Sequence, residues 1–169
     1  MPEITAELIR QLREMTSAGV MDCKKALEES NGDIDGAVKK LGEMGIATAA
    51  KKADRETAQG LVESYIHAGG RIGVIVEVAC ETDFVARTDD FKTLARDIAM
   101  QVAAMNPATI TEDEPVPESA GGRVDEVVLL KQPWIKDGSK DIRTLINETI
   151  GKTGENIQIK RFARFEIGE

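Results

Sequence analysis

The sequence predicts an α+β protein with a small three-helix domain over residues 1–43, a linker over 44–59, and an α+β core with an antiparallel sheet over 60–169. Two observations predict this division. Before Gly42, apolar residues recur at spacings of three and four, which is the period of an amphipathic helix. After Gly60, short runs rich in β-branched residues are separated by a turn sequence, which is typical of paired strands. With 169 residues, 41% of them hydrophobic, the chain is long enough to build a core.

Each of the three N-terminal helices has a start signal. Thr5, Asp22 and Asp33 can accept hydrogen bonds from the first free backbone amides of a helix, so we expect helices to begin after them. The first helix should end near Gly19 and the second at Asn31–Gly32, because glycine suits the left-handed conformation that closes a helix. The predicted inward positions are Leu8, Leu12 and Met15 in the first helix, Cys23, Ala26 and Leu27 in the second, and Ile34, Ala37, Val38 and Leu41 in the third.

The predicted core begins with a β-hairpin. Residues 61–66 and 72–79 are rich in β-branched and aromatic residues, and the segment 68–71 between them contains two adjacent glycines that suit a tight turn. The segment before this hairpin, from Gly42 to Gly60, is rich in alanine and contains Lys51, Lys52 and Arg55. This composition is compatible with an exposed helix that leads to the second unit, and we interpret the segment as the linker.

A long helix and a final strand complete the predicted core. Apolar residues trace one helical stripe over 91–105, and Pro107 ends it. The segment 109–122 is rich in proline, glycine and acidic residues, which predicts a loop. A second core helix is predicted over 141–150 and a last strand over 157–167. Together these elements place helices on one antiparallel sheet.

The charge balance argues against a nucleic-acid surface. The chain has 22 Lys and Arg against 30 Asp and Glu, a net charge of −8, and its basic residues are scattered among the acids. Binding to a nucleic-acid backbone needs several clustered cations that displace counterions. We therefore expect a protein partner and no direct contact with nucleic acid. No apolar run approaches the length of about 20 residues that spans a bilayer, so we expect a cytoplasmic protein that does not contact a membrane.

The two cysteines and the single histidine predict neither a disulfide framework nor a metal site. Cys23 and Cys80 lie in different segments, and no secretory signal precedes them, which favours two buried, reduced thiols. With His67 as the one histidine and no CxxC pair, three or four transition-metal ligands cannot be assembled. We expect no bound metal and no cofactor.

The possible catalytic motifs do not predict an enzyme. Gly151–Thr153 copies the end of a phosphate-binding loop, but Ile146 occupies the place of its first glycine and the preceding segment has a helical pattern. We therefore expect the chain itself to bind no nucleotide. A nucleophilic Cys80 with His67 as its base is conceivable across the hairpin, yet a buried structural cysteine is the favoured interpretation.

The segment Thr82–Val85 lies where the chain passes from a strand directly into a helix. Thr82 or Asp83 can cap the following amides, which leaves Phe84 and Val85 on a short, protruding first turn. In one interpretation Phe84 packs into the local core. In the other it is an aromatic anchor, with a carboxylate beside it, that fills a pocket on a partner. The residue types alone leave both interpretations open.

Four segments, in this order, resemble the signature segments of the elongation factor Ts family: AGVMDCKKAL at 18–27, TDFVAR at 82–87, GENI at 154–157 and RFARFEIG at 161–168. The resemblance implies an N-terminal domain of the ubiquitin-associated type. It also implies a guanine-nucleotide exchange factor that binds elongation factor Tu with GDP and promotes release of GDP and Mg²⁺ during translation elongation. In this view Asp83 and Phe84, with Thr82 and Val85 beside them, enter the GTPase domain of the partner and disturb its Mg²⁺ and phosphate site.

The resemblance further implies partner contacts at Val20, Met21, Lys24 and Lys52. Longer members of the family carry two related core halves, whereas this chain has one hairpin-plus-helix unit, so we expect a homodimer. The helical stretch that short members usually have is replaced here by a brief loop over 109–123. An alternative function is a non-enzymatic adaptor whose three-helix unit binds ubiquitin-like proteins or peptides. That function leaves the segment 82–85 without a role.

Overall fold

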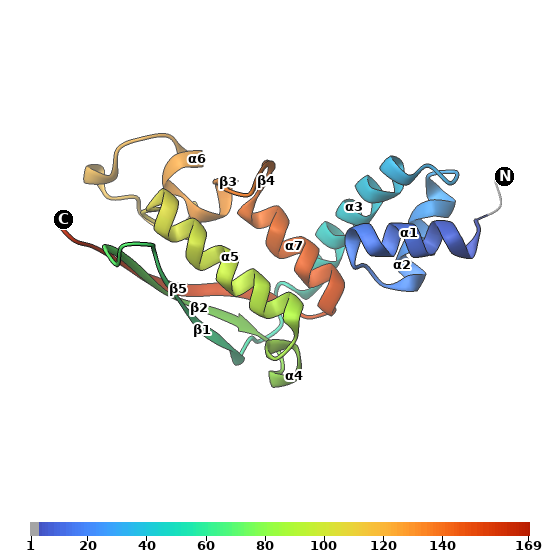
Figure 1. Ribbon diagram of the computed structural model, residues 1–169, viewed down its shortest axis with the longest axis horizontal. Coiled ribbons are helices and arrows are strands. Elements are labelled where there is room, and N and C mark those ends of the chain that lie inside the picture. Colours follow the sequence, from blue (N-terminus) through green and yellow to red (C-terminus); the bar gives the residue numbers. More distant parts are fainter. Residues whose placement is uncertain (1–3) are drawn as a thin grey trace.

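The computed structural model describes residues 4–169 and contains helices and an antiparallel sheet, so the predicted α+β class is confirmed. The N-terminal helices occupy one end of an elongated molecule, and the sheet with its covering helices occupies the other (Figure 1). The helices are α1 Ala6–Thr16, α2 Val20–Glu29, α3 Ile34–Lys52, α4 Asp83–Ala86, α5 Asp89–Met105, α6 Val124–Val127 and α7 Ile142–Thr153, with 3₁₀ turns η1 Glu118–Ala120 and η2 Leu129–Lys131. The strands are β1 Gln59–Ile66, β2 Ile72–Cys80, β3 Pro133–Trp134, β4 Asp137–Asp141 and β5 Ile157–Glu166.

Two of the three predicted helix starts in the N-terminal part are confirmed. The Thr5 hydroxyl accepts a hydrogen bond from the Leu8 amide at 3.3 Å, and the Asp33 carboxylate accepts one from the Gly36 amide at 2.7 Å. The prediction for Asp22 was wrong, because α2 begins after Gly19 and places Asp22 in its first turn. A carboxylate is favourable there as well, since it faces the positive end of the helix dipole.

A small set of apolar side chains forms the core of the three N-terminal helices. Its fully buried members are Leu12, Cys23, Ala26, Leu27 and Ala37. Met15 and Val38 were predicted to join them, but both are exposed and line an open cavity beside α1 and α3. The helical period alone places them on the inward side, whereas no neighbouring helix reaches far enough to cover them.

Helix α3 is longer than predicted and replaces most of the expected linker. Residues 44–52, which we interpreted as part of a linker, continue the helix to Lys52. Alanine favours helix over this stretch, and Gly42 and Gly45 weaken it without stopping it. The added turns pack against α7, where Gly45 lies so close that a Cβ atom would come within 3.1 Å of the Asn147 carbonyl oxygen. The N-terminal helices are therefore joined to the core by a packed helix.

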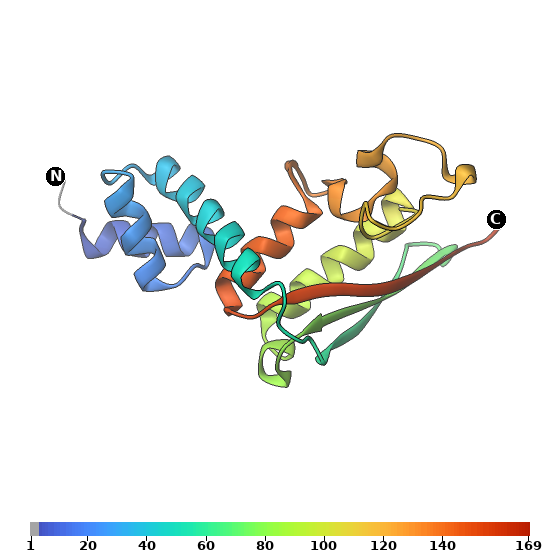
Figure 2. The same ribbon diagram turned by 180° about the vertical axis from the view of Figure 1, so that it is seen from behind.

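The core sheet has the order β1–β2–β5 with both neighbouring pairs antiparallel, so the predicted hairpin and final strand are confirmed. Gly60 in β1 has φ of +149°, and a Cβ atom there would collide with the Val78 carbonyl oxygen. Only glycine allows β1 to approach β2 at this point. Helix α5 covers one face of the sheet and α7 lies beside it, as the two opposite views show (Figures 1 and 2).

A buried glutamine pair holds the segment between α5 and α7. The Gln101 amide donates to the Gln132 side-chain oxygen at 3.2 Å, and its own oxygen accepts from the Ile135 amide at 2.9 Å. The strands β3 and β4 were not predicted, because β3 has only two residues and β4 has no apolar residue that would reveal an alternating pattern. Over residues 4–169, no helix is both long and apolar enough to cross a membrane.

Candidate partner-binding site

The most prominent candidate is the turn formed by α4, which projects from the end of β2 at the edge of the core (Figure 1). Thr82 caps this turn, because its hydroxyl accepts a hydrogen bond from the Val85 amide at 3.3 Å. Phe84 is 76% exposed, although phenylalanine is usually buried. The structure therefore rules out the interpretation of Phe84 as a core residue of the free chain.

Val85 does not share this exposure. We expected it to protrude beside Phe84, but it is only 4% exposed and belongs to the core cluster with Ala86 and Phe91. The difference follows from helical geometry, since successive residues point about 100° apart around the axis. The turn thus uses Val85 to attach itself to the core and presents Phe84 outward.

Asp83 lies next to Phe84 and forms an ion pair with Arg87. Its carboxylate accepts a hydrogen bond from the Arg87 guanidinium at 2.8 Å, and both side chains are largely exposed. Exposed ion pairs of this spacing typically contribute about 0.3–0.5 kcal/mol, so the pair can open at little cost. The carboxylate is available to another partner.

Glu155, which lies between α7 and β5, supports the start of the turn from the neighbouring segment of the core. One of its carboxylate oxygens accepts the backbone amides of Glu81 at 3.0 Å and Thr82 at 2.9 Å, and the other accepts the Thr82 hydroxyl. Glu155 belongs to the GENI segment that carried the resemblance, but its sequence context gave no sign of this contact, which joins residues 73 and 74 positions apart. Only the folded chain brings them together.

The predicted contacts on α2 lie on its surface. Val20 and Met21 are exposed hydrophobic residues, Met21 to 72%, and each lies in the first turn of the helix. Lys24 is one turn further along and is about half exposed, with its ammonium 3.9 Å from the Glu28 carboxylate. Such a loose surface pair leaves the lysine free to change partners.

Lys52 is placed differently. Its ammonium donates a hydrogen bond to the Gly154 carbonyl oxygen, where α7 ends, and the residue is half-buried. A cation is favourable at the C-terminal end of a helix, because the last carbonyl groups are unpaired there. In the free chain Lys52 therefore joins the ends of α3 and α7.

The structure separates the two groups of the conceivable thiol dyad. Cys80 ends β2 and pairs with Gln59, whereas His67 follows the opposite end of β1 and contacts Tyr65. Burial raises the pKa of the Cys80 thiol to about 11, which disfavours the reactive thiolate.

The structure also offers no phosphate-binding loop at Gly151–Thr153, because this segment lies inside α7 rather than between a strand and a helix. Over residues 4–169, no group of three or more His, Cys, Asp or Glu side chains is arranged to hold a metal ion.

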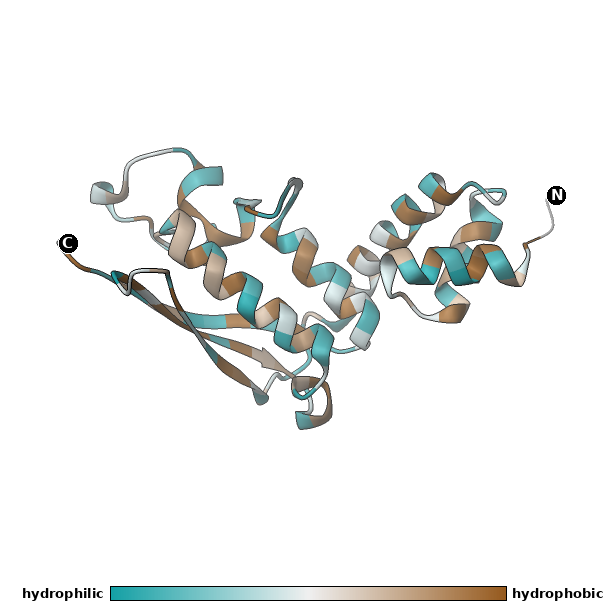
Figure 3. Cartoon of the chain, viewed as in Figure 1, coloured by the Kyte–Doolittle hydropathy of each residue, from teal (hydrophilic) through white to brown (hydrophobic). Residues whose placement is uncertain are grey.

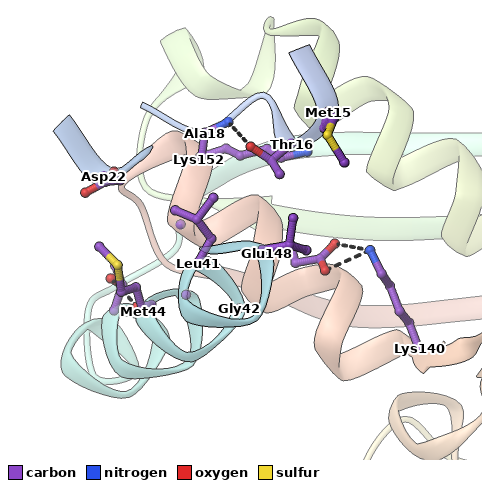
Figure 4. A pocket seen from close by; sticks show the side chains of 14 residues that line it. Met15, Thr16, Ala18, Asp22, Leu41, Gly42, Met44, Lys140, Glu148 and Lys152 are labelled. Carbon is purple, nitrogen blue, oxygen red and sulfur yellow. Dashed lines mark hydrogen bonds and ion pairs between the residues drawn. The ribbon is translucent and has the colours of Figure 1, made fainter. Parts of the chain in front are cut away.

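A cavity of about 230 Å³ lies between the N-terminal helices and α7 (Figure 4). Met15, Leu41 and Met44 contribute apolar surface, and the ion pair of Lys140 with Glu148 at 2.9 Å lies at its rim. The predicted contact residues on α2 and α4 are not among those that line it. The cavity is separate from the candidate site.

Comparisons with known proteins agree with the sequence motifs. The sequence model of the family described as "Elongation factor TS" matches residues 3–123. Elongation factor Ts of Syntrophomonas wolfei is 50% identical over 98% of this chain and 91% of its own length. The corresponding proteins of Carboxydothermus hydrogenoformans and Thermotoga neapolitana are 48% and 47% identical, over 98% and 99% of this chain and 90% and 98% of their own lengths.

The alignments with these three proteins extend over 195 or 196 positions, more than the 169 residues of this chain, so the relatives contain residues that it lacks. The family match nevertheless covers most of the chain, and the identity extends from one end to the other. The chain belongs to the elongation factor Ts family of translation elongation factors.

Proposed function

We propose that the chain binds elongation factor Tu in its GDP form and accelerates the release of GDP and Mg²⁺. In this proposal Phe84 is an aromatic wedge that enters the GTPase domain of the partner. The observation that carries the proposal is the exposure of Phe84, 76%, on a turn that is capped and attached to the core. The chain performs no bond chemistry of its own in this role, since the nucleotide is bound by the partner.

The exposed phenyl ring can supply enough free energy to change nucleotide affinity. Moving a phenylalanine side chain from water into an apolar groove contributes about 1.5–3 kcal/mol. Because Thr82 and Val85 already hold the turn, little conformational entropy remains to be lost on binding. A rigid turn is therefore a better wedge than a flexible loop that carries the same residue.

Exchange follows from thermodynamic linkage between the chain and the nucleotide. If Phe84 binds better to the nucleotide-free partner than to the GDP-bound one, binding of the chain lowers the affinity for GDP. The coupling is reciprocal, so incoming GTP then lowers the affinity for the chain and expels it. Asp83 contributes near the Mg²⁺ site through its charge or by accepting backbone amides, once its exposed pair with Arg87 opens.

Helix α2 provides a second contact in this proposal. Val20 and Met21 offer an exposed apolar surface, and Lys24 offers a cation one turn away. Lys52 is the weaker candidate, because its ammonium already contacts Gly154. Two separate contacts on one chain give affinity through α2 while the wedge acts through α4.

We also propose that two copies of the chain pair through the uncovered face of the core sheet. All three strands contain hydrophobic residues (Figure 3). On the face that α5 does not cover, several of them are exposed around a shallow depression of about 400 Å³, and Phe165 is 70% exposed. Its exposed hydrophobic residues are Val62, Ile66, Ile75, Phe165 and the adjacent Ile167. An apolar patch of this kind usually marks an interface. A second copy would supply the core half that longer relatives carry in one chain.

Stopped-flow release of fluorescently labelled GDP from elongation factor Tu tests the proposal. We expect the release rate to rise with the concentration of the chain and to saturate. The same measurement with Phe84→Ala should show a much smaller rise. A release rate that does not depend on the concentration of the chain would contradict the proposed function.

A further inference from the structure

The direction of the Phe84 turn depends on a contact outside the turn itself. Helix α4 has only four residues, and a helix of that length has little stability of its own. Val85 and Ala86 attach one side of the turn to the core. The start of the turn, where the chain leaves β2, is held by three hydrogen bonds to the Glu155 carboxylate from Glu81 and Thr82.

Glu155 is itself fixed by its neighbours. The Asn156 amide donates a hydrogen bond to the Glu81 carboxylate at 2.8 Å, so the two segments hold each other in both directions. The Asn156 side chain donates to the carbonyl oxygens of Ala53 at 3.3 Å and Arg55 at 2.9 Å, just after α3. Asn156 is almost fully buried, and a buried amide with both donor bonds satisfied is rigid. The backbone next to Glu155 is therefore held at a defined position, from which the carboxylate reaches Glu81 and Thr82.

Thr82 transmits this position to Phe84. Its backbone amide and hydroxyl both bind Glu155, and the same hydroxyl oxygen accepts the Val85 amide. Its carbonyl oxygen accepts the Ala86 amide at 3.3 Å, which is the first hydrogen bond of α4. A displacement of Thr82 would consequently tilt the whole turn, and the exposed ring at its tip would move furthest.

We propose that Glu155 is a positioning residue for the exchange reaction, which orients the turn so that Phe84 enters the partner. This inference rests on the proposed function and adds a residue that does not itself touch the nucleotide site. Its role is geometric, because the contact consists of acceptor oxygens on backbone and hydroxyl donors. Glutamine is therefore a suitable replacement: its oxygen can accept the two amides, and its NH₂ group can donate to the Thr82 hydroxyl.

The test compares Glu155→Ala, Glu155→Gln and the control Glu118→Ala, an exposed glutamate on the η1 turn. GDP release from elongation factor Tu is measured over a range of protein concentrations. We expect Glu155→Ala to lower the maximal release rate about tenfold, which is the lower end of the loss expected for removing the Phe84 ring, because the misplaced ring keeps part of its interaction. The concentration at half-maximal rate should change little, because the α2 contact is intact. Glu155→Gln and Glu118→Ala should retain the parent rate.

A double-mutant cycle with Phe84→Ala separates positioning from a general loss of structure. If Glu155 acts through Phe84, adding Glu155→Ala to Phe84→Ala should lower the rate by less than about twofold. A general loss of folded protein would lower the rate by the same factor in both backgrounds. An equal fall in rate in both backgrounds, or a parent-like maximal rate for Glu155→Ala, would overturn the positioning role. The proposed nucleotide-exchange function would then still stand.

Amide hydrogen exchange of the chain alone tests the orienting role without measuring nucleotide release from the partner. The Ala86 and Arg87 amides donate to the carbonyl oxygens of Thr82 and Asp83 and do not contact Glu155. We expect them to exchange about tenfold faster in Glu155→Ala and at the parent rate in Glu155→Gln. If the parent chain fails to release GDP, the proposed function is wrong. In that case unchanged protection in Glu155→Ala overturns the orienting role as well, and faster exchange supports it.

Discussion

Gly45 of α3 and Gly151 of α7 face each other at the contact between the two helices: a Cβ atom on Gly151 would lie 3.4 Å from the Gly45 Cα atom. A Cβ atom on Gly45 would lie 3.1 Å from the Asn147 carbonyl oxygen. The two backbones therefore touch directly, with no side chain between them. This contact sets the distance between the N-terminal helices and the core.

The first prediction concerns this contact. Gly45→Val places a branched side chain against the α7 backbone, and overpacking of this kind costs about 1–3 kcal/mol of unfolding free energy. The control Gly42→Ala has no atom within 4 Å of the new Cβ and should stabilise the helix slightly. Denaturant unfolding followed by the fluorescence of Trp134, the one tryptophan, measures both. A Gly45→Val protein as stable as the parent would mean that the helices can separate freely.

The second prediction concerns Phe84. Phe84→Ala should slow stimulated GDP release about tenfold to a hundredfold, because about 1.4 kcal/mol of lost interaction corresponds to each factor of ten. Its thermal stability should hardly change, since the ring is exposed in the free chain. The matched control is Phe91→Ala, which removes a fully buried ring and should cost about 3–5 kcal/mol of stability. Loss of stability in Phe84→Ala, or parent-like release, contradicts the wedge.

The third prediction concerns the α2 surface. Lys24→Ala should raise the concentration needed for half-maximal GDP release and leave stability within about 0.5 kcal/mol, as is usual for a surface substitution. Lys25→Ala, on the next residue of the same helix, is the control and should leave this concentration unchanged. Titration calorimetry with elongation factor Tu checks the affinity directly. If Lys24→Ala and Lys25→Ala bind elongation factor Tu with equal affinity, Lys24 is not part of the interface.

The fourth prediction concerns the uncovered sheet face. Light scattering at micromolar concentration should give twice the chain mass of 18.3 kDa. Phe165→Asp should give the monomer mass, because a carboxylate is costly to bury in an apolar interface. The control Val124→Asp replaces an exposed hydrophobic residue on α6 and should remain dimeric. A parent protein that is monomeric at every concentration, with exchange intact, excludes the dimer proposal.

The fifth prediction concerns Cys80. Burial raises the pKa of its thiol from 9.0 to about 11, so the folded chain keeps the thiol neutral over a range in which the unfolded chain ionises it. This contribution to stability is complete below about pH 9 and is lost as the pH rises toward 11. The stability difference between the parent and Cys80→Ala should therefore shrink over that interval in denaturant titrations. GDP release by Cys80→Ala should match the parent, which a thiol enzyme would not allow.

The sequence predicted those parts of the fold that depend on local patterns. The hairpin follows from two β-branched runs with Gly69 and Gly70 between them, and the capping roles of Thr5 and Asp33 follow from residue type. The local pattern left the end of α3 open, because alanine favours helix there while Gly42 and Gly45 weaken it; packing on α7 stabilises the last turns. Tertiary packing of this kind regularly outweighs local propensity.

The candidate site, like the fold, could be predicted only in part from the sequence. The segment 82–85 could be located from the change of strand to helix, but the opposite fates of Phe84 and Val85 depend on where the core lies. Glu155 could not be linked to the turn, since its hydrogen-bond partners are more than 70 positions away. Local patterns carry no information about such distant contacts.

The continuity of α3 also decides where this protein can change in length. Each residue of an α-helix advances the chain by about 1.5 Å and turns it by about 100°. One residue inserted between Leu41 and Gly45 would therefore rotate the whole N-terminal bundle and direct α2 away from its present side of the molecule. An insertion in the loop over 109–123 leaves that geometry unchanged. Length variation is compatible with the loop and incompatible with the helix.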